Sequence, residues 1–142
     1  FICDQVFPEE IMPRLFSTFT HYFTMSHGEG WDLNCIECAA MGKIIVAPEH
    51  TAYTDYLNEE IAYLIRNNKK IPAVHDVPSI NMLCRGGLWF EPNEEETISL
   101  LRESVENFSR AQIKAKNCTK YILENFTWEK SIKPLSEFFK NL

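Results

Sequence analysis

The sequence has neither a long apolar run nor an excess of basic residues. No stretch approaches the roughly 20 apolar residues that a membrane-spanning helix needs, and residues 1–3 lack the basic start of a signal peptide. The 14 Lys and Arg are outnumbered by 20 Asp and Glu, for a net charge of −6, which argues against a nucleic-acid partner. We therefore expect a cytoplasmic protein without a transmembrane segment, held at a membrane only peripherally and through segments outside this chain.

Cysteine is also scarce, at five residues. An odd number favours reduced intracellular thiols over a disulfide framework. A structural zinc site usually needs four ligands, and the one close pair, Cys35 and Cys38, has no second pair to match it. We therefore expect no metal site and no bound cofactor.

What is present is the composition of one globular domain. With 45% hydrophobic residues among 142, the chain is long enough to bury a core. It starts in strand-like residues without an initial Met. We interpret residues 1–142 as a single, incomplete domain of a longer protein.

Two predicted strands lie close together in the first third of the chain. Residues 22–26 form a short aromatic and polar run, and residues 44–47 read Ile-Ile-Val-Ala. The second run is apolar without alternation, as in a buried parallel strand. With a helix between them, the two runs predict an α/β fold with a Rossmann-like parallel sheet and flanking helices.

The helix between these strands is predicted over residues 33–41. Asp32 or Asn34 is the candidate N-cap, and Gly42 is the candidate left-handed residue after its end. The first backbone N–H groups of a helix have no partner within it, and the helix dipole adds partial positive charge there. In open α/β sheets this end of the helix lies at the carboxyl edge, where ligands usually bind.

Two carboxylates flank the turn before this helix. Gly28 and Gly30 leave room for a phosphate to approach the main chain. Glu29 lies between them, and Glu37 lies just over one turn inside the helix. Carboxylates accept hydrogen bonds in pairs, so each can hold neighbouring hydroxyls of a sugar. An anion cradle between two such acids suits a nucleotide-diphosphate sugar.

The same residues carry a family resemblance. Glu29 and Glu37 are separated by seven residues, and Glu37 is followed by Cys-Ala-Ala-Met-Gly-Lys-Ile-Ile-Val-Ala. This resembles the E-x7-E segment of retaining GT-B glycosyltransferases, notably glycosyltransferase family 4. Residues 54–65, 87–92 and 126–129 look like later segments of the same domain. The likeness covers nearly the whole chain, as the later part of a C-terminal, donor-binding domain that ends in long helices.

The resemblance implies roles for individual residues. The family's first acid, matched by Glu29, faces the donor sugar at the catalytic centre, and its second acid, matched by Glu37, holds the ribose hydroxyls. Amides between the acids contact the diphosphate or sugar, and an earlier turn lies near the base. The matching donor-binding residues are Gly30, Trp31, Asp32 and Leu33 for the amides, and Val6 and Phe7 for the base. By resemblance, the reaction retains the anomeric configuration and needs no metal.

Asp32, His27 and Trp31 belong to the same turn. The family commonly has glycine where this chain has Asp32, and a carboxylate there repels phosphate unless it points outward or caps the helix. We predict that His27 touches the donor sugar. Trp31 either packs to shape the turn or contacts the ligand.

The resemblance places the acceptor-binding domain and the start of the donor domain, with the family's basic pair for the diphosphate, before residue 1. The acceptor is then a saccharide, lipid or protein, and the base, the sugar and the oligomeric state stay open. We expect the isolated chain to bind a donor weakly and to transfer little or no sugar.

Two other functions stay open. Cys35 and Cys38, at the start of a helix after a strand, have the placement of a thioredoxin-like redox pair, in which the helix dipole lowers the pKa of the first thiol. Glu37 lies within this pair and opposes thiolate formation. The second alternative is a non-catalytic module that binds a sugar nucleotide without transferring the sugar.

Shorter elements are predicted around the central unit. Residues 1–3 are predicted to end a strand, and Pro8 to open a helix. Its side facing the sheet is predicted to consist of Ile11, Leu15 and Phe19, extended by Met12 and Phe16. A helical turn is predicted at residues 53–57, a strand at 62–65, and an irregular or edge strand at 71–77.

The last third of the chain is predicted to be helical. Asn93 and Glu96 have the spacing of a capping box. The expected buried residues are Ile98, Leu101, Val105 and Phe108, followed by Ile113, Tyr121 and Ile122 up to about residue 125. Thr127 is expected to cap a final helix through Phe139, with Trp128 in the core and with a kink or break at Pro134.

Overall fold

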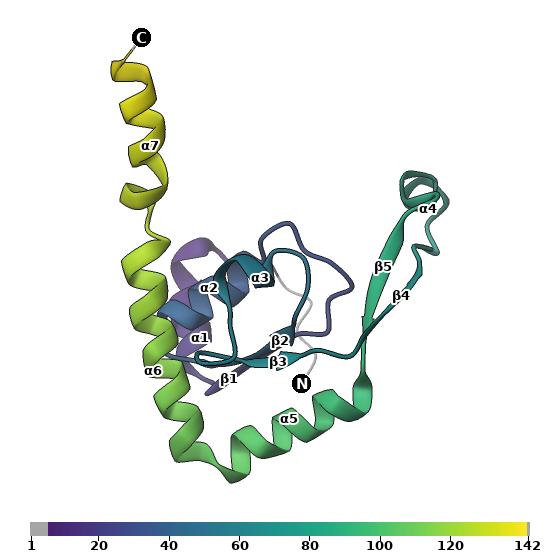
Figure 1. The fold of residues 1–142 in the computed structure, drawn as a ribbon, viewed down its shortest axis with the longest axis horizontal. Coiled ribbons are helices and arrows are strands. Elements are labelled where there is room, and N and C mark those ends of the chain that lie inside the picture. The colour runs from purple at the N-terminus through teal and green to yellow at the C-terminus, as the bar shows by residue number, and fades with distance from the viewer. Residues whose placement is uncertain (1–5, 142) are drawn as a thin grey trace.

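The structure, a computed structural model, describes residues 6–141. Its main sheet is parallel, and its strands lie in the order β1 (His21–Phe23), β2 (Ile44–Pro48), β3 (Tyr63–Ile65). The chain is therefore an α/β protein, and its sheet with flanking helices is consistent with a Rossmann-like fold (Figure 1). The strand predicted at residues 1–3 lies outside the described residues.

Helices cover both faces of the sheet. Ile45 and Ala47 of β2 share a core cluster with residues of α1 (Met12–Ser17), α2 (Leu33–Ala40) and α3 (Tyr53–Tyr56). Ile44 and Val46 share the opposite cluster with residues of α5 (Glu94–Glu106) and α6 (Phe108–Asn125). Because both faces are covered, every residue of β2 is buried, and this explains its unbroken apolar run.

The predicted helix after the turn is confirmed. Asp32 is the N-cap of α2, and Gly42 adopts the left-handed conformation with φ of 76°. The N–H groups of Gly42 and Lys43 donate to the carbonyls of Ala39 and Cys38 at 3.1 and 3.0 Å, which is the hydrogen-bond pattern of a Schellman motif. The preceding strand is shorter than predicted, because β1 ends at Phe23 and residues 24–26 belong to the turn.

The buried face of α1 agrees with the prediction at three positions and differs from it at Ile11 and Leu15. Phe16 is buried, and Met12 and Phe19 pack against the same cluster, whereas Ile11 and Leu15 are exposed. Ile11 ends the 3₁₀ helix η1 (Glu9–Ile11), which has three residues per turn. The helical phase counted from Ile11 is therefore shifted in the α-helix that follows.

The buried face of α5 also differs from the prediction. Thr97 and Ser104 are its buried residues, whereas Ile98 and Val105 are exposed. The two hydroxyls donate to carbonyls of their own helix, at 2.7 Å each. Small side chains with satisfied hydroxyl groups let α5 approach the sheet closely. Leu101, predicted to be buried, is partly buried against the same cluster, as is Leu100.

Helix α6 buries mainly small residues, together with Ile122, which is buried as predicted. Its buried residues are Ala111, Ala115, Cys118 and Ile122. Tyr121 is partly buried against the same core, also as predicted. Phe108 and Ile113, predicted to be buried, are 38% and 62% exposed. The predicted end of this helix near residue 125 is confirmed.

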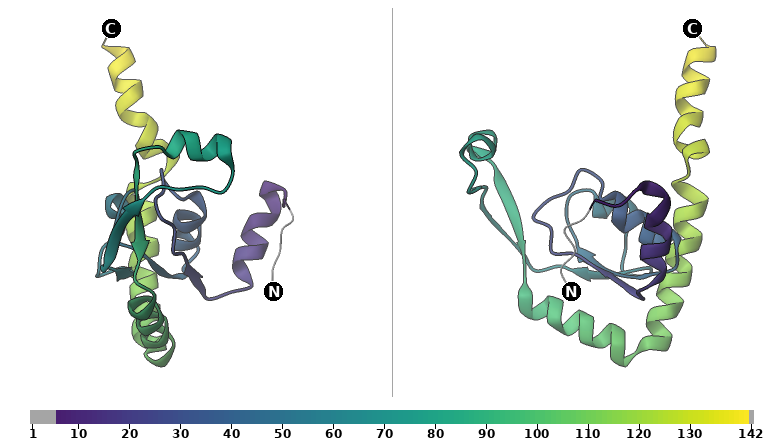
Figure 2. Two further views of the ribbon diagram at one scale, coloured as in Figure 1. Left: turned by 90° about the vertical axis from the view of Figure 1, so that its right-hand side faces the viewer. Right: turned by 180° about the vertical axis from the view of Figure 1, so that it is seen from behind.

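The final helix, α7 (Trp128–Lys140), projects away from the sheet (Figures 1 and 2). Thr127 caps it by accepting a hydrogen bond from the Lys130 N–H, as predicted. The helix continues past Pro134 without interruption, and it has no buried residue. Trp128 is 80% exposed, so its prediction as a core residue is wrong.

A second sheet extends from the body on the side of the carboxyl ends of the parallel strands (Figure 1). It pairs β4 (Asn68–Pro72) with β5 (Leu88–Pro92) in antiparallel register, and α4 (Pro78–Cys84) lies at its tip. We call residues 68–92 the arm. The edge strand predicted at residues 71–77 is therefore misplaced, because the paired residues begin and end earlier.

Candidate functional site

The turn between β1 and α2 lies at the carboxyl edge of the parallel sheet, beside the loop that follows β2. The Glu29 N–H donates to Oγ1 of Thr51 at 3.1 Å. The Ser26 hydroxyl donates to Oε1 of Glu29 at 2.8 Å. The backbone and the carboxylate of Glu29 are thus both held by hydroxyl groups.

Asp32 closes this turn with its side chain directed into the protein. Its carboxylate accepts a hydrogen bond from the Cys35 N–H at 3.1 Å, from the Tyr22 hydroxyl at 3.1 Å and from the Tyr53 hydroxyl at 2.7 Å. Burial, and then the neighbouring Asp32, raise the pKa of Tyr22, so this hydroxyl keeps its proton and donates. Asp32 therefore caps α2, as the sequence allowed, while its charge stays near the helix entrance.

Asp32 is also one of two non-glycine residues with a left-handed backbone in the described part of the chain. Its φ is 59°, and the other residue, Thr51, has φ of 49°. Both side chains hold the same turn, Asp32 at its end and Thr51 at Glu29. Backbone strain of this kind often gathers at functional sites.

A row of backbone N–H groups runs from the turn into the helix. Within residues 6–141, no hydrogen-bond acceptor is found for the N–H groups of residues 30–34. A Cβ added at Gly30 would meet no atom within 4 Å, so space is open there. Gly28 and Gly30 do not have the left-handed backbone that favours glycine, so an absent side chain, rather than an unusual backbone, is what they contribute.

Glu37 does not line the turn that carries Glu29. It lies in the groove between α1 and α2. A cavity of about 470 Å³ opens there. Its lining combines carboxylates with an apolar floor and consists of Glu9, Glu10, Met12, Pro13, Phe16, Glu37, Ala40 and Met41. Of the two predicted acids, Glu37 therefore lines a cavity of a size typical of ligand sites, whereas Glu29 lies in the hydroxyl-bonded turn.

The remaining predicted residues differ in their surroundings. Trp31 packs against Tyr56 and Phe126, at centroid distances of 5.3 and 5.9 Å, and is still 36% exposed. Leu33 is 64% and Val6 97% exposed. Phe7 is half-buried. Trp31 thus has a packing role, and its exposed part leaves room for the predicted ligand contact.

The arm contacts this turn, which the sequence analysis does not predict. Trp89 stacks on His27 at 5.4 Å, and Phe90 stacks on His50 at 4.6 Å with an interplanar angle of 14°. The Phe90 N–H donates to the His27 carbonyl at 3.0 Å. The aromatic run at residues 88–90 was a visible signal, but its partners lie about 40 and 60 residues earlier in the chain.

The cysteine pair does not have the surroundings of a redox site. Cys35 and Cys38 are fully buried. Burial raises the pKa of the Cys38 thiol to about 12, and burial is also the main reason that the pKa of Cys35 is raised. Since a thiolate is the reactive species, both thiols are suited to packing rather than to exchange.

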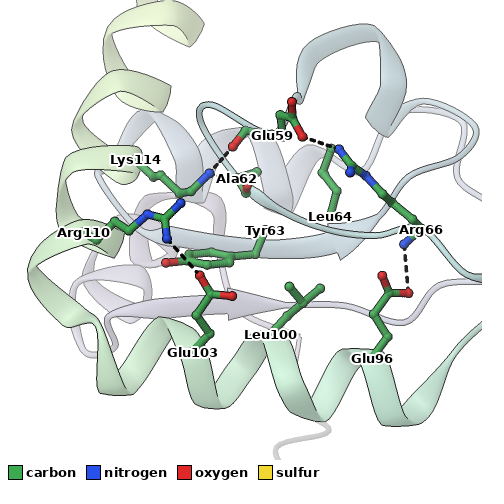
Figure 3. Close-up of a pocket in the computed structure, with 10 residues that line it drawn as sticks. All are labelled: Glu59, Ala62, Tyr63, Leu64, Arg66, Glu96, Leu100, Glu103, Arg110 and Lys114. Carbon is green, nitrogen blue, oxygen red and sulfur yellow. Dashed lines mark hydrogen bonds and ion pairs between the residues drawn. The ribbon is translucent and has the colours of Figure 1, made fainter.

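A second cavity lies between β3, α5 and α6, away from the turn (Figure 3). It has a volume of about 300 Å³, and its charged side chains form ion pairs or hydrogen bonds with the backbone. Glu103 pairs with Arg110 and Glu59 with Arg66, while the Lys114 ammonium donates to the carbonyls of Glu59 and Ala62. The Glu103–Arg110 pair joins α5 to α6, and the Glu59–Arg66 pair joins the two segments beside β3. The hydrogen bonds of Lys114 are what connect α6 to the segment before β3.

Comparison of the chain with models of known protein families and with curated protein sequences finds no match in either. Nowhere in residues 6–141 do three or more His, Cys, Asp or Glu side chains gather so that they could hold a metal ion. In the same residues, no helix combines the length and apolarity needed to span a membrane. The resemblance to a glycosyltransferase family therefore stays a sequence-based prediction.

Proposed function

We propose that this chain is the donor-binding part of a retaining glycosyltransferase of the GT-B type and binds a nucleotide-diphosphate sugar. One observation carries the proposal. The five consecutive N–H groups of residues 30–34, which lack acceptors within residues 6–141, lie between Glu29 and Glu37 at the carboxyl edge of a parallel sheet. Such a row of donors suits the oxygens of a diphosphate.

In this proposal the nucleoside binds in the groove at Glu37. A carboxylate can accept both hydroxyls of a ribose, and Met12, Phe16 and Met41 give the same cavity an apolar surface. A base packs against such a surface with its flat face. At the other end of the N–H row, Glu29 orients the donor sugar, and Ser26 and Thr51 hold Glu29 in place.

The amides of residues 30–33 contribute to the chemical step. When the sugar leaves the diphosphate, negative charge grows on the leaving oxygens. Preorganised N–H dipoles stabilise that charge without having to reorganise. This chain's contribution to transfer is then to bind the nucleotide, orient the sugar and stabilise the leaving group.

Asp32 sets a limit on this binding. Its carboxylate lies at the helix entrance, and the negative charge offsets part of the helix dipole that a diphosphate would use. The three hydrogen-bond donors around it, from Tyr22, Tyr53 and Cys35, keep it directed inward. We therefore expect weak binding by this chain alone, strengthened by cationic groups that the resemblance places upstream.

Nuclear magnetic resonance of the ¹⁵N-labelled chain tests the proposal. Titration with UDP-glucose, GDP-mannose and ADP-glucose at millimolar concentration should shift the amide signals of residues 30–34 for at least one donor. Glu37→Gln should weaken that binding about tenfold, the loss expected for one charge-assisted hydrogen bond. Glu106→Gln, an exposed acid at the end of α5, is the matched control. Unchanged amide signals with every donor, or undiminished binding by Glu37→Gln, would refute the proposal.

A second measurement separates binding from transfer. In a protein that joins this chain to its acceptor domain, Glu29→Gln should reduce sugar transfer while nucleotide affinity stays nearly unchanged. Equal losses of affinity and transfer would assign Glu29 to binding only. Donor binding without any transfer by the joined protein would favour the non-catalytic module.

A further inference from the structure

His50 is a buried polar residue whose hydrogen bonding is incomplete. It follows β2, is 4% exposed, and stacks on Phe90 of the arm at 4.6 Å. Tyr53 meets its ring at 6.2 Å, edge-on. Its Nε2 atom is buried, with no hydrogen-bond partner in the described residues. Since an unpaired buried polar atom is unfavourable, a phenylalanine would serve packing alone better than this histidine.

The other ring nitrogen of His50 has a partner that leads to the turn. Nδ1 lies 3.2 Å from Oγ1 of Thr51, and the same oxygen accepts the Glu29 N–H at 3.1 Å. A threonine hydroxyl can take part in both bonds at once, whichever nitrogen of the imidazole carries the proton. His50, Thr51 and Glu29 therefore form a continuous chain of hydrogen bonds.

The backbone of Thr51 indicates that this arrangement is held in place. Its φ of 49° is left-handed, a conformation that is unfavourable for a β-branched residue. Relaxing this strain would move Oγ1 away from both of its partners. The contacts of Oγ1 with His50 and Glu29 oppose that movement.

The arm holds the same turn at a second point. The Phe90 N–H donates to the His27 carbonyl, two residues before Glu29. Phe90 is also the residue on which His50 stacks. His50 thus contacts both residues that hydrogen-bond to the turn, Thr51 and Phe90.

We propose that His50 is a positioning residue, which fixes the turn carrying Glu29 through Thr51 and fastens that turn to the arm through Phe90. It does not touch the donor. The inference deepens the proposed function and rests on it for the role of Glu29, while the hydrogen-bond chain itself can be tested without a ligand.

The ligand-free test follows the Glu29 amide in the ¹⁵N-labelled chain. His50→Phe keeps the stack on Phe90 but removes Nδ1, so the Glu29 amide signal should shift and its hydrogen exchange should become about tenfold faster. Thr51→Val should have the same effect, and Thr51→Ser should restore the original signal. The double variant His50→Phe with Thr51→Val should add little to either single change.

His21→Phe is the matched control. His21 also has a buried, unpaired Nε2 and lies near an aromatic ring, that of Phe108 at 6.2 Å, but it lies at the start of β1, away from the turn. This variant should leave the Glu29 amide unchanged. An unchanged Glu29 amide in folded His50→Phe and in Thr51→Val would overturn the inference and make His50 a packing residue.

Donor binding gives a readout that separates this inference from the proposed function. His50→Phe should weaken the binding of the nucleotide sugar more than the binding of the matching nucleoside diphosphate, because Glu29 faces the sugar. Equal weakening of the two would overturn the positioning role. If neither ligand binds the unaltered chain, the proposed function fails, while the Glu29 amide still decides whether the hydrogen-bond chain exists.

Discussion

Tyr53 donates a 2.7 Å hydrogen bond to Oδ2 of Asp32, across 21 residues of sequence. This bond joins the helix that follows β2 to the N-cap of the helix that follows β1. It also fixes the direction of the Asp32 carboxylate, whose negative charge repels any anion at the helix entrance. The stability of the turn and its affinity for a diphosphate are therefore opposed at Asp32.

Asp32→Gly tests that opposition. Glycine accepts the left-handed backbone of residue 32 but leaves the hydroxyls of Tyr22 and Tyr53 without their acceptor. We expect the free energy of unfolding to fall by about 2 kcal/mol, measured by urea denaturation. The same variant should bind a nucleoside diphosphate several-fold more tightly, because a negative charge has been removed.

Asp32→Asn is the control for this prediction. Asparagine tolerates a left-handed backbone and retains one acceptor oxygen. It should therefore lose less stability than Asp32→Gly and show a similar gain in affinity. Weaker diphosphate binding by both variants would show that Asp32 aids binding instead of opposing it.

The central part of the fold was predictable because local signals agree there. Ile44 to Ala47 is apolar without alternation, as a strand covered on both faces must be, and Gly42 is the residue type that a left-handed helix end favours. The same local rules placed a cap at Asp32 or Asn34. They could not find the two tyrosine hydroxyls, because Tyr22 and Tyr53 meet Asp32 only in the folded protein.

The C-terminal helices show where local reasoning fails. Hydrophobic periodicity selects large apolar residues, whereas close packing of a helix on a sheet selects small ones. Thr97, Ser104 and Ala111 are buried, and Ile98 and Ile113 are exposed. The arm was missed for a related reason, since its contacts with His27 and His50 link residues far apart in sequence.

Thiol labelling tests the burial of the cysteine pair. With iodoacetamide at pH 8, Cys84, which is only half-buried, should be labelled within minutes. Cys35, Cys38 and Cys118 are buried and have raised pKa values, so they should stay unlabelled until urea is added. Peptide mass spectrometry resolves the individual sites. Rapid labelling of Cys35 below neutral pH would instead support the redox alternative.

Protonation of His50 should destabilise the fold. Burial, and then the neighbouring His27, lower the pKa of His50 from its ordinary value of 6.5. The unfolded chain therefore takes up the proton first as the pH falls. The contribution of neutral His50 to stability is full above about pH 6.5 and is lost as the pH drops below that value toward the folded-state pKa.

The comparison of the unaltered chain with His50→Phe isolates this effect. The groups that face His50 are His27 and Thr51 from the loops, Tyr53 from α3 and Phe90 from β5, with Lys70 of β4 lying against the Phe90 ring. Urea denaturation at pH 7.5 and 5.5 should show a larger loss of stability for the unaltered chain. Since His21 is present in both proteins, its own titration cancels. Equal losses would show that His50 titrates normally.

One pair of substitutions tests which face of α6 is buried. Ala111 is fully buried against the sheet, so Ala111→Leu forces extra volume into a packed layer and should cost about 1–3 kcal/mol. Ile113, two residues later, is 62% exposed, and Ile113→Ala should change the free energy of unfolding by no more than about 0.5 kcal/mol. The hydrophobic periodicity of the sequence predicts the opposite order, because it buries Ile113. Urea denaturation of the two variants therefore decides between a helix face chosen by residue size and one chosen by hydrophobicity.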